Sequence, residues 1–160
     1  MQDRASLLTE FILETFRLNG ELLDAGDSLV RDIGLTSARW QVLGAIALSP
    51  VPLPVAHTAR NMGLSRQAVQ RVANELEKQG LVAFAPNPHH ARAQLLVLKE
   101  KGARAYAAAM ERQRPWATHL GAKLSTEDIK ITLKVMRAIR DRLESSATSR
   151  SVANGIEKHK

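Results

Sequence analysis

With 160 residues, 44% of them hydrophobic, the chain is long enough for one folded unit with its own core, and its composition excludes global disorder. The absence of cysteine excludes disulfides and thiolate metal ligands, and the longest apolar run, residues 42–48, is far shorter than the roughly 20 residues of a membrane span. The net charge of +7 favours polyanionic partners and suits plain solubility equally well. Because the chain has no apolar run of span length and no apolar signal-peptide core, we expect a soluble cytoplasmic protein.

The first predicted element is a long helix over residues 6–33. Its mainly apolar positions recur at steps of three and four, which places them on one side of a helix: Leu8, Phe11, Thr15, Leu18, Leu22, Ala25, Leu29 and Ile33. Gly34 ends the helix. Because the apolar stripe is longer than a small domain needs, we expect a second helix or a second chain to cover it.

A second helix begins at Thr36 or Ser37, either of which can cap it, and runs to about Leu48. The next segment, residues 49–54, contains three prolines, which end the helical pattern. Within it, residues 51–53 are compatible with a short edge strand.

Two helices joined by a tight turn come next. Residues 55–62 form a helix of about two turns, and residues 63–64 form the turn. Ser65 then caps a longer helix that ends at Gln79, since Gly80 is a stop signal. This order is typical of a helix-turn-helix.

A β-hairpin follows the helix-turn-helix. The short apolar runs 81–84 and 94–98 have the character of strands, and the segment 85–93 between them is rich in turn-forming residues. The chain is helical again from Glu100, and Pro115 should kink or interrupt that helix. The hairpin would form the wing of a winged helix-turn-helix.

The last predicted helix starts at Ser125-Thr126-Glu127-Asp128, which resembles a capping box with Asp128 in the place usually held by Glu or Gln. Apolar residues at steps of three and four continue this helix to about Leu143. Small and polar residues then dominate, and we expect a flexible tail over residues 147–160.

The helix that starts at Ser65 has two distinct sides. Val69, Val72 and Leu76 lie at steps of three and four and should face the core. The opposite side carries side chains that can read base edges: Gln67, Gln70, Arg71 and Asn74. A solvated polar surface is the alternative, but such surfaces usually carry Glu and Lys. We predict that this side reads DNA, with Gln70 and Arg71 as the main base readers.

Four further residues are candidate DNA contacts outside that set. Ser65 and Arg66 lie at the start of the helix, where backbone N–H groups and the helix dipole attract a phosphate. Arg60, on the preceding helix, is a candidate phosphate contact. Arg92, in the predicted wing, is placed to enter a minor groove, whose negative potential attracts arginine.

Five segments together resemble the MarR family of bacterial transcription regulators. They are LTSARWQVL (residues 35–43), ARNMGLSRQAV (59–69), LEKQGLV (76–82), NPHHARA (87–93) and LKEKG (98–102). The chain departs from the family in the wing, where the usual Asp-Arg-Arg is His90-Ala91-Arg92. Arg92 thus keeps one of the two cations of the family's wing, whereas the acidic residue that would orient it is replaced by His90.

The resemblance implies a mainly α fold with a small β-hairpin wing. It implies a winged helix-turn-helix lobe over residues 35–102 and a helical dimerisation region over residues 1–34 and 103–146. It also implies a homodimer that binds double-stranded DNA at a pseudo-palindromic operator. We expect it to act as a repressor, with a small-molecule effector releasing the DNA.

The family precedent also places a ligand cavity between the dimerisation helices and the DNA-binding lobe. Phe16, Trp40 and Trp116 are the aromatic candidates for its lining, although Trp40 suits a core position better. Arg17 and Arg39 are candidate anchors for the carboxylate of an aromatic acid.

No enzyme motif is found in the sequence. It has no glycine-rich phosphate loop and no nucleophile with a base at motif spacing, and its histidines lack metal-ligand spacing. We therefore predict no catalytic site, cofactor or metal. Two alternative functions stay open: a non-specific or architectural nucleic-acid-binding protein, and a protein-interaction adaptor that has kept the fold and lost the DNA.

Overall fold

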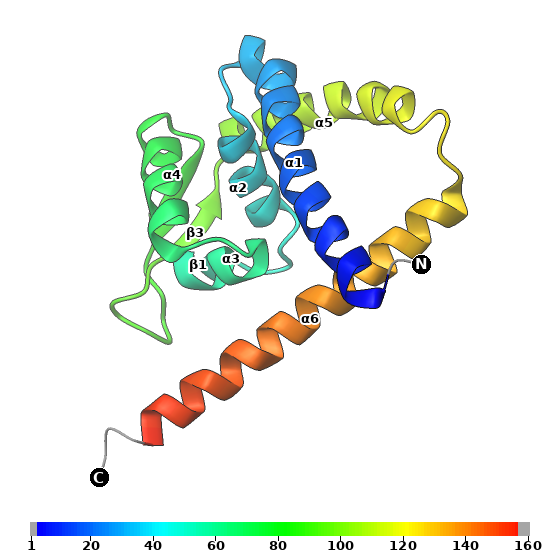
Figure 1. Ribbon diagram of the computed structural model, residues 1–160. Helices are drawn as coiled ribbons and strands as arrows, with labels where there is room; N and C mark the ends of the chain where they lie inside the picture. The colour runs from blue at the N-terminus through cyan, green and yellow to red at the C-terminus, as the bar shows by residue number, and fades with distance from the viewer. Residues whose placement is uncertain (1–2, 157–160) are drawn as a thin grey trace. The chain divides into compact units, whose positions relative to one another are not determined.

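The computed structural model describes residues 3–156, with the side chains of residues 3–146. They form mainly helices and one small antiparallel sheet, as the sequence predicts (Figure 1). The chain divides into two compact units, Met1–Pro115 and Trp116–Lys160. The sheet and the helix-turn-helix both belong to the first unit, which therefore contains the candidate functional site.

Helix α1 (Arg4–Val30) is the predicted long N-terminal helix. Asp3 caps it, since its Oδ1 accepts a hydrogen bond from the backbone N–H of Ser6 at 2.8 Å, and this bond lowers the pKa of the Asp3 carboxyl. A single 3-10 turn, η1 (Arg31–Ile33), follows. Gly34 ends it in the left-handed region at φ 75°, which confirms the predicted stop.

Helix α2 (Ser37–Ala47) is held against α1 at its first turn. Thr36 is the capping residue, because its Oγ1 accepts a backbone N–H of that turn at 3.3 Å. The backbone N–H of Ser37 also donates to Oδ1 of Asp27, on α1, at 2.5 Å. Gly26 permits this close approach, since a Cβ there would lie 2.6 Å from Oγ of Ser37.

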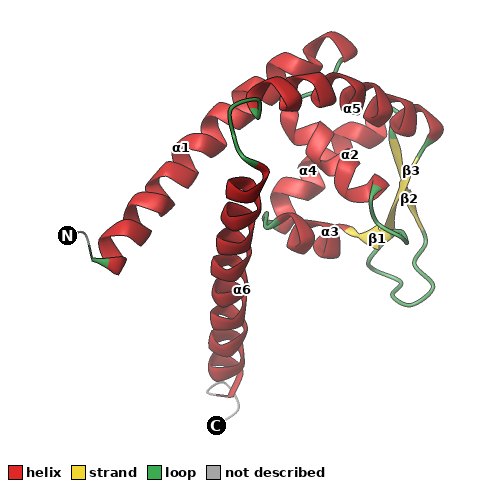
Figure 2. Cartoon of the chain, turned by 90° about the vertical axis from the view of Figure 1, so that its right-hand side faces the viewer, coloured by secondary structure: helices red, strands yellow, loops and turns green. Residues whose placement is uncertain are grey.

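The remaining elements of the lobe follow in the predicted order. They are β1 (Leu53–Pro54), α3 (Val55–Met62), α4 (Arg66–Lys78), β2 (Val82–Ala85) and β3 (Leu95–Leu98). The sheet order is β1-β3-β2 with both pairs antiparallel, so β3 is the central strand. Figure 2 shows the loop that joins β2 and β3 extending beyond the sheet, as a wing does.

The edge strand β1 lies slightly later in the chain than the predicted residues 51–53. Leu53 pairs with Leu96 and Pro54 with Leu95, so the pairing partner on β3 sets the strand position. Proline is tolerated there because an edge strand needs no N–H donor on its outer side.

The core of the lobe lies between α2, α4 and the sheet. Leu43, Leu76 and Leu96, one from each of these parts, are at most 1% exposed. Helix α5 (Glu100–Leu120) adds Tyr106, whose ring lies so close to Gly44 that an added Cβ would approach it to 3.2 Å. The outer side of α4 is therefore presented on a well-packed support.

An ion pair joins η1 to α5 at the edge of this packing. Nη2 of Arg112 donates to Oδ2 of Asp32 at 2.7 Å. This hydrogen bond lowers the pKa of the Asp32 carboxyl and raises the pKa of Arg112.

Of the two effects expected at Pro115, an interruption is wrong, because α5 continues through it to Leu120, and a kink stays a prediction. Proline removes one backbone donor, and the hydrogen bonds on both sides of it are sufficient to keep the helix.

Helix α6 (Thr126–Ile156) begins with the predicted cap. Ser125 Oγ accepts from the backbone N–H of Asp128 at 3.0 Å and donates to the Asp128 carboxylate at 2.6 Å. The helix continues past the end that we expected near Leu143, because the sequence after that residue contains no proline to stop it. The end of the predicted flexible tail, residues 157–160, lies outside the described residues.

Candidate nucleic-acid interface

The turn between α3 and α4 is built on a left-handed glycine. Gly63 has φ 66°, and its N–H donates to the carbonyl of Arg60 at 3.1 Å. Ser65 then caps α4, since its Oγ accepts the backbone N–H of Ala68 at 3.1 Å. Both local predictions are confirmed, and they set the direction in which α4 leaves the turn.

The inner side of α4 is fully committed to the core. Val69 and Leu76 have no exposed surface, and Val72 is 8% exposed, as the spacing predicts. At the C-terminal end of α4, Nζ of Lys101 donates to the carbonyl of Gln79 at 2.8 Å, a favourable place for a cation. With its inner side anchored, α4 exposes one defined polar side.

We call that exposed polar side the outer face of α4. It borders a cavity of 690 Å³ lined by Arg66, Gln67, Gln70, Arg71, Asn74, Glu75 and Lys78. The predicted base-reading residues are therefore brought together, with Gln67, Arg71 and Asn74 exposed and Gln70 half-buried. Glu75 and Lys78 also line this cavity and were not among the predicted contacts, although Lys78 lies four residues after Asn74 and so continues the same side of the helix.

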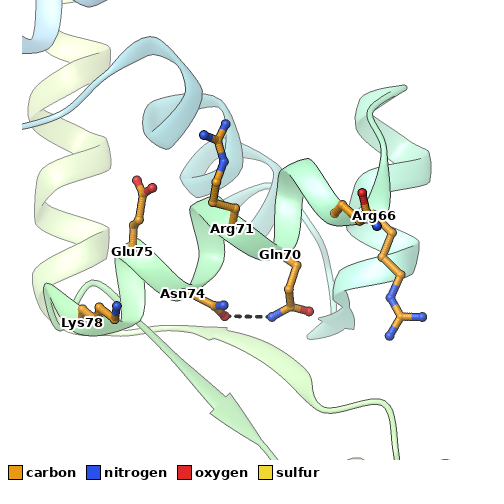
Figure 3. Close-up of a pocket in the computed structure, with 7 residues that line it drawn as sticks. Arg66, Gln70, Arg71, Asn74, Glu75 and Lys78 are labelled. Atoms are coloured by element: carbon orange, nitrogen blue, oxygen red, sulfur yellow. Dashed lines mark hydrogen bonds between the residues drawn. The ribbon is translucent and has the colours of Figure 1, made fainter.

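Two pairs of side chains divide the outer face. Figure 3 shows Gln70 and Asn74 on one side of α4, joined by a hydrogen bond from Gln70 Nε2 to Asn74 Oδ1 of 2.9 Å. Arg71 and Glu75 point to the other side. The hydrogen bond thus places both carboxamides on one strip of the outer face.

Glu75 is paired with Arg39 of α2. Its Oε2 accepts from Nε of Arg39 at 3.2 Å and from Nη2 at 3.1 Å. The Arg39 side chain is 24% exposed and that of Glu75 41%. The carboxylate on the outer face is therefore neutralised from within the lobe.

The wing loop between β2 and β3 is closed by Asn87. Its Nδ2 donates to the carbonyl of Ala93 at 2.9 Å, and its Oδ1 accepts the backbone N–H of His89 at 3.0 Å. A second cavity, of 490 Å³, lies between this loop and the starts of α3 and α4. Arg66, Gln70 and Arg92 are among its lining residues, so three predicted DNA contacts border one cavity.

Arg60 stands apart from both cavities. It is exposed on the last turn of α3 and is not among the residues that line either of them. Ser65 also lines neither cavity, so two of the candidate phosphate contacts lie outside both of them.

The residues predicted to form a ligand cavity have other surroundings in the structure. Phe16 is 70% exposed on α1, and Arg17 pairs with Glu14 of the same helix at 3.3 Å. Arg39 is engaged by Glu75, as described above, and Trp40 packs against the core. Trp116 belongs to the second unit. Arg17 and Arg39, the two predicted anion anchors, thus each have a carboxylate partner within the chain. The ligand cavity itself stays a prediction.

No helix in the described part of the chain is both long and apolar enough to cross a membrane.

The chain is similar in sequence or in fold to several known proteins. An uncharacterised protein of Mycobacterium tuberculosis is 39% identical over 105 residues, which cover 66% of this chain and 72% of that protein. The transcriptional activatory protein BadR of Rhodopseudomonas palustris is 25% identical, over 96% of this chain and 91% of its own. The crystal structure of CouR from Rhodococcus jostii RHA1, bound to p-coumaroyl-CoA, has the same fold, with a TM-score of 0.71 at 22% identity over 82% of this chain and 90% of its own.

A sequence model of the MarR family matches residues 33–93, from the end of η1 through α2, α3, α4 and β2 to the wing loop. The match thus falls on the elements that position the outer face of α4. The family-model match, the similarity to the proteins named above and the winged helix-turn-helix fold together show that the chain belongs to the MarR family. Members of this family are transcription regulators and not enzymes.

Proposed function

We propose that the chain is a cytoplasmic regulator that binds a specific double-stranded DNA sequence as a homodimer, with α4 in the major groove. One observation carries this proposal: the outer face of α4 gathers amides and guanidinium groups on a helix whose inner side is buried. Amides pair with adenine and guanidinium with guanine, which is the chemistry of major-groove reading.

Within this proposal the candidate contacts have different roles. Gln70 and Arg71 read base edges, because they lie near the middle of the outer face. Arg66 and Arg60 contact phosphates, which adds affinity without sequence information. Arg92, exposed on the wing, enters the adjacent minor groove.

Helix α1 supports the dimer part of the proposal. Leu8, Leu18 and Leu22 are between 41% and 49% exposed in the single chain, and Phe16 is 70% exposed. Complete burial of an exposed leucine side chain contributes about 1.5–3 kcal/mol, and each of these leucines has somewhat less than half of its surface left to bury, so the exposed side chains of α1 favour association. We place the dimerisation region in residues 1–34 and 103–146 and the DNA-binding lobe in residues 35–102.

The proposal includes regulation of DNA binding by a small molecule. We expect repression, with release by a small-molecule effector; CouR, of the same fold, has been crystallised with an acyl-CoA ligand. BadR is named as an activatory protein, so a reporter assay must decide the sign of regulation here.

The deciding experiment is selection of bound duplexes from a random pool at physiological salt. A homodimer should enrich two inverted half-sites whose centres lie about 10 base pairs apart. Binding without any enriched sequence would favour the architectural alternative. Absence of salt-dependent binding would favour the adaptor alternative, because phosphate contacts make DNA affinity depend on salt.

A further inference from the structure

Arg71 and Glu75 occupy positions where an ion pair would be expected. They are four residues apart on α4 and point to the same side of it (Figure 3). Opposite charges at this spacing attract one another on a helix. Instead, the Glu75 carboxylate accepts two hydrogen bonds from Arg39, on α2, and none of the ion pairs or hydrogen bonds found among the described residues involves the Arg71 side chain.

We propose that Arg39 is a positioning residue for DNA recognition: by holding the carboxylate of Glu75, it keeps the guanidinium of Arg71 available to DNA. This inference rests on the proposed function of the outer face of α4. It assigns to α2 a part in recognition, although α2 itself need not touch the DNA.

Burial of the Arg39 side chain explains why Glu75 pairs with Arg39 and not with Arg71. The Arg39 side chain is three-quarters covered, so packing has already restricted its rotamers, and it directs two N–H groups at one oxygen. Arg71 is exposed and would lose rotamer freedom by pairing. The Glu75 carboxylate therefore pairs with Arg39, whose guanidinium is the less mobile of the two.

The same contact changes the electrostatics of the outer face. Glu75 is the only acid among the residues that line the cavity along α4, where Arg66, Arg71 and Lys78 are the cations. An unpaired carboxylate at this place would repel phosphates and compete with DNA for Arg71. Pairing with Arg39 removes both effects.

A simpler role for the Arg39–Glu75 pair would be to fasten α2 to α4. That role predicts that breaking the pair from either side lowers stability and that a double substitution brings no recovery of DNA binding. The positioning role predicts recovery, because the harmful group after loss of Arg39 is the released carboxylate. The two roles therefore differ in the double variant.

The test measures the dissociation constant for the selected duplex, at fixed salt, for wild type, Arg39→Gln, Glu75→Gln and the double variant. Arg39→Gln should weaken binding about 10-fold, the size of one lost base contact. Arg39→Lys, which keeps a cation for Glu75, should restore most of the affinity. The double variant should return to within about 3-fold of wild type, since no carboxylate is left to hold Arg71.

Equal weakening in the double variant and in Arg39→Gln would overturn the inference, while sequence-specific binding by wild type would leave the proposed function standing. A second readout needs no DNA: the Nε–Hε resonance of Arg71 in the free protein. It should shift in Arg39→Gln and return in the double variant. An Arg71 resonance unchanged by Arg39→Gln would overturn the inference even if the chain bound no DNA. Thermal unfolding of each variant confirms that the comparison is made on folded protein.

Discussion

Gly102 in α5 offers a prediction whose size follows from the structure. A Cβ at this position would lie 2.0 Å from the carbonyl oxygen of Leu81 and 2.9 Å from Cδ1 of Leu98. The Leu81 carbonyl also accepts the backbone N–H of Lys99 at 3.0 Å, so it cannot retreat without weakening that bond. Overpacking costs about 1–3 kcal/mol, and a helix-propensity gain of about 1 kcal/mol offsets part of this cost, so we expect Gly102→Ala to lower the free energy of unfolding by up to about 2 kcal/mol.

Gly20 provides the matched control, because it is also a helical glycine and, its chain neighbours and the adjacent helix backbone aside, no atom lies within 4 Å of its Cβ position. Gly20→Ala should stabilise the protein by about 0.5–1 kcal/mol through helix propensity alone. Urea unfolding followed by circular dichroism, at one protein concentration because a dimer is concentration-dependent, measures both variants. If Gly102→Ala were as stable as Gly20→Ala, the close approach of α5 to the base of the wing hairpin would be refuted.

Three further predictions address the DNA contacts, an ion pair and the dimer. Arg71→Ala should lose about 1–3 kcal/mol of discrimination at one base pair, whereas Arg66→Ala should weaken binding to all sequences alike; titrations against operator variants distinguish the two. The pKa of Asp32 is lowered by Arg112, so this pair stabilises the fold above the unfolded-state pKa of the carboxyl. The excess stability of wild type over Asp32→Asn should therefore vanish as the pH falls through the folded-state pKa, and an excess that persisted in acid would contradict the assignment. Phe16→Ser should weaken the dimer in sedimentation experiments, and an unchanged dissociation constant would place the interface elsewhere.

Sequence alone identified the parts of the fold that depend on contacts within a few residues. The cap at Ser65, the left-handed stop at Gly34 and the turn at Gly63 were predicted and confirmed, because hydrogen bonds to neighbouring residues determine them. The two sides of α4 were likewise predicted from steps of three and four, which convert directly into directions around a helix axis.

The tertiary structure decided everything that depends on residues far apart in the chain. The partner of Glu75 is Arg39, 36 positions away, and no periodicity could select it over Arg71. The place of β1 follows from its pairing with β3, and the need for glycine at position 102 follows from the carbonyl of Leu81. Local patterns thus gave the helices and the side chains of the outer face of α4, whereas packing between elements determined which of its charges are left for DNA.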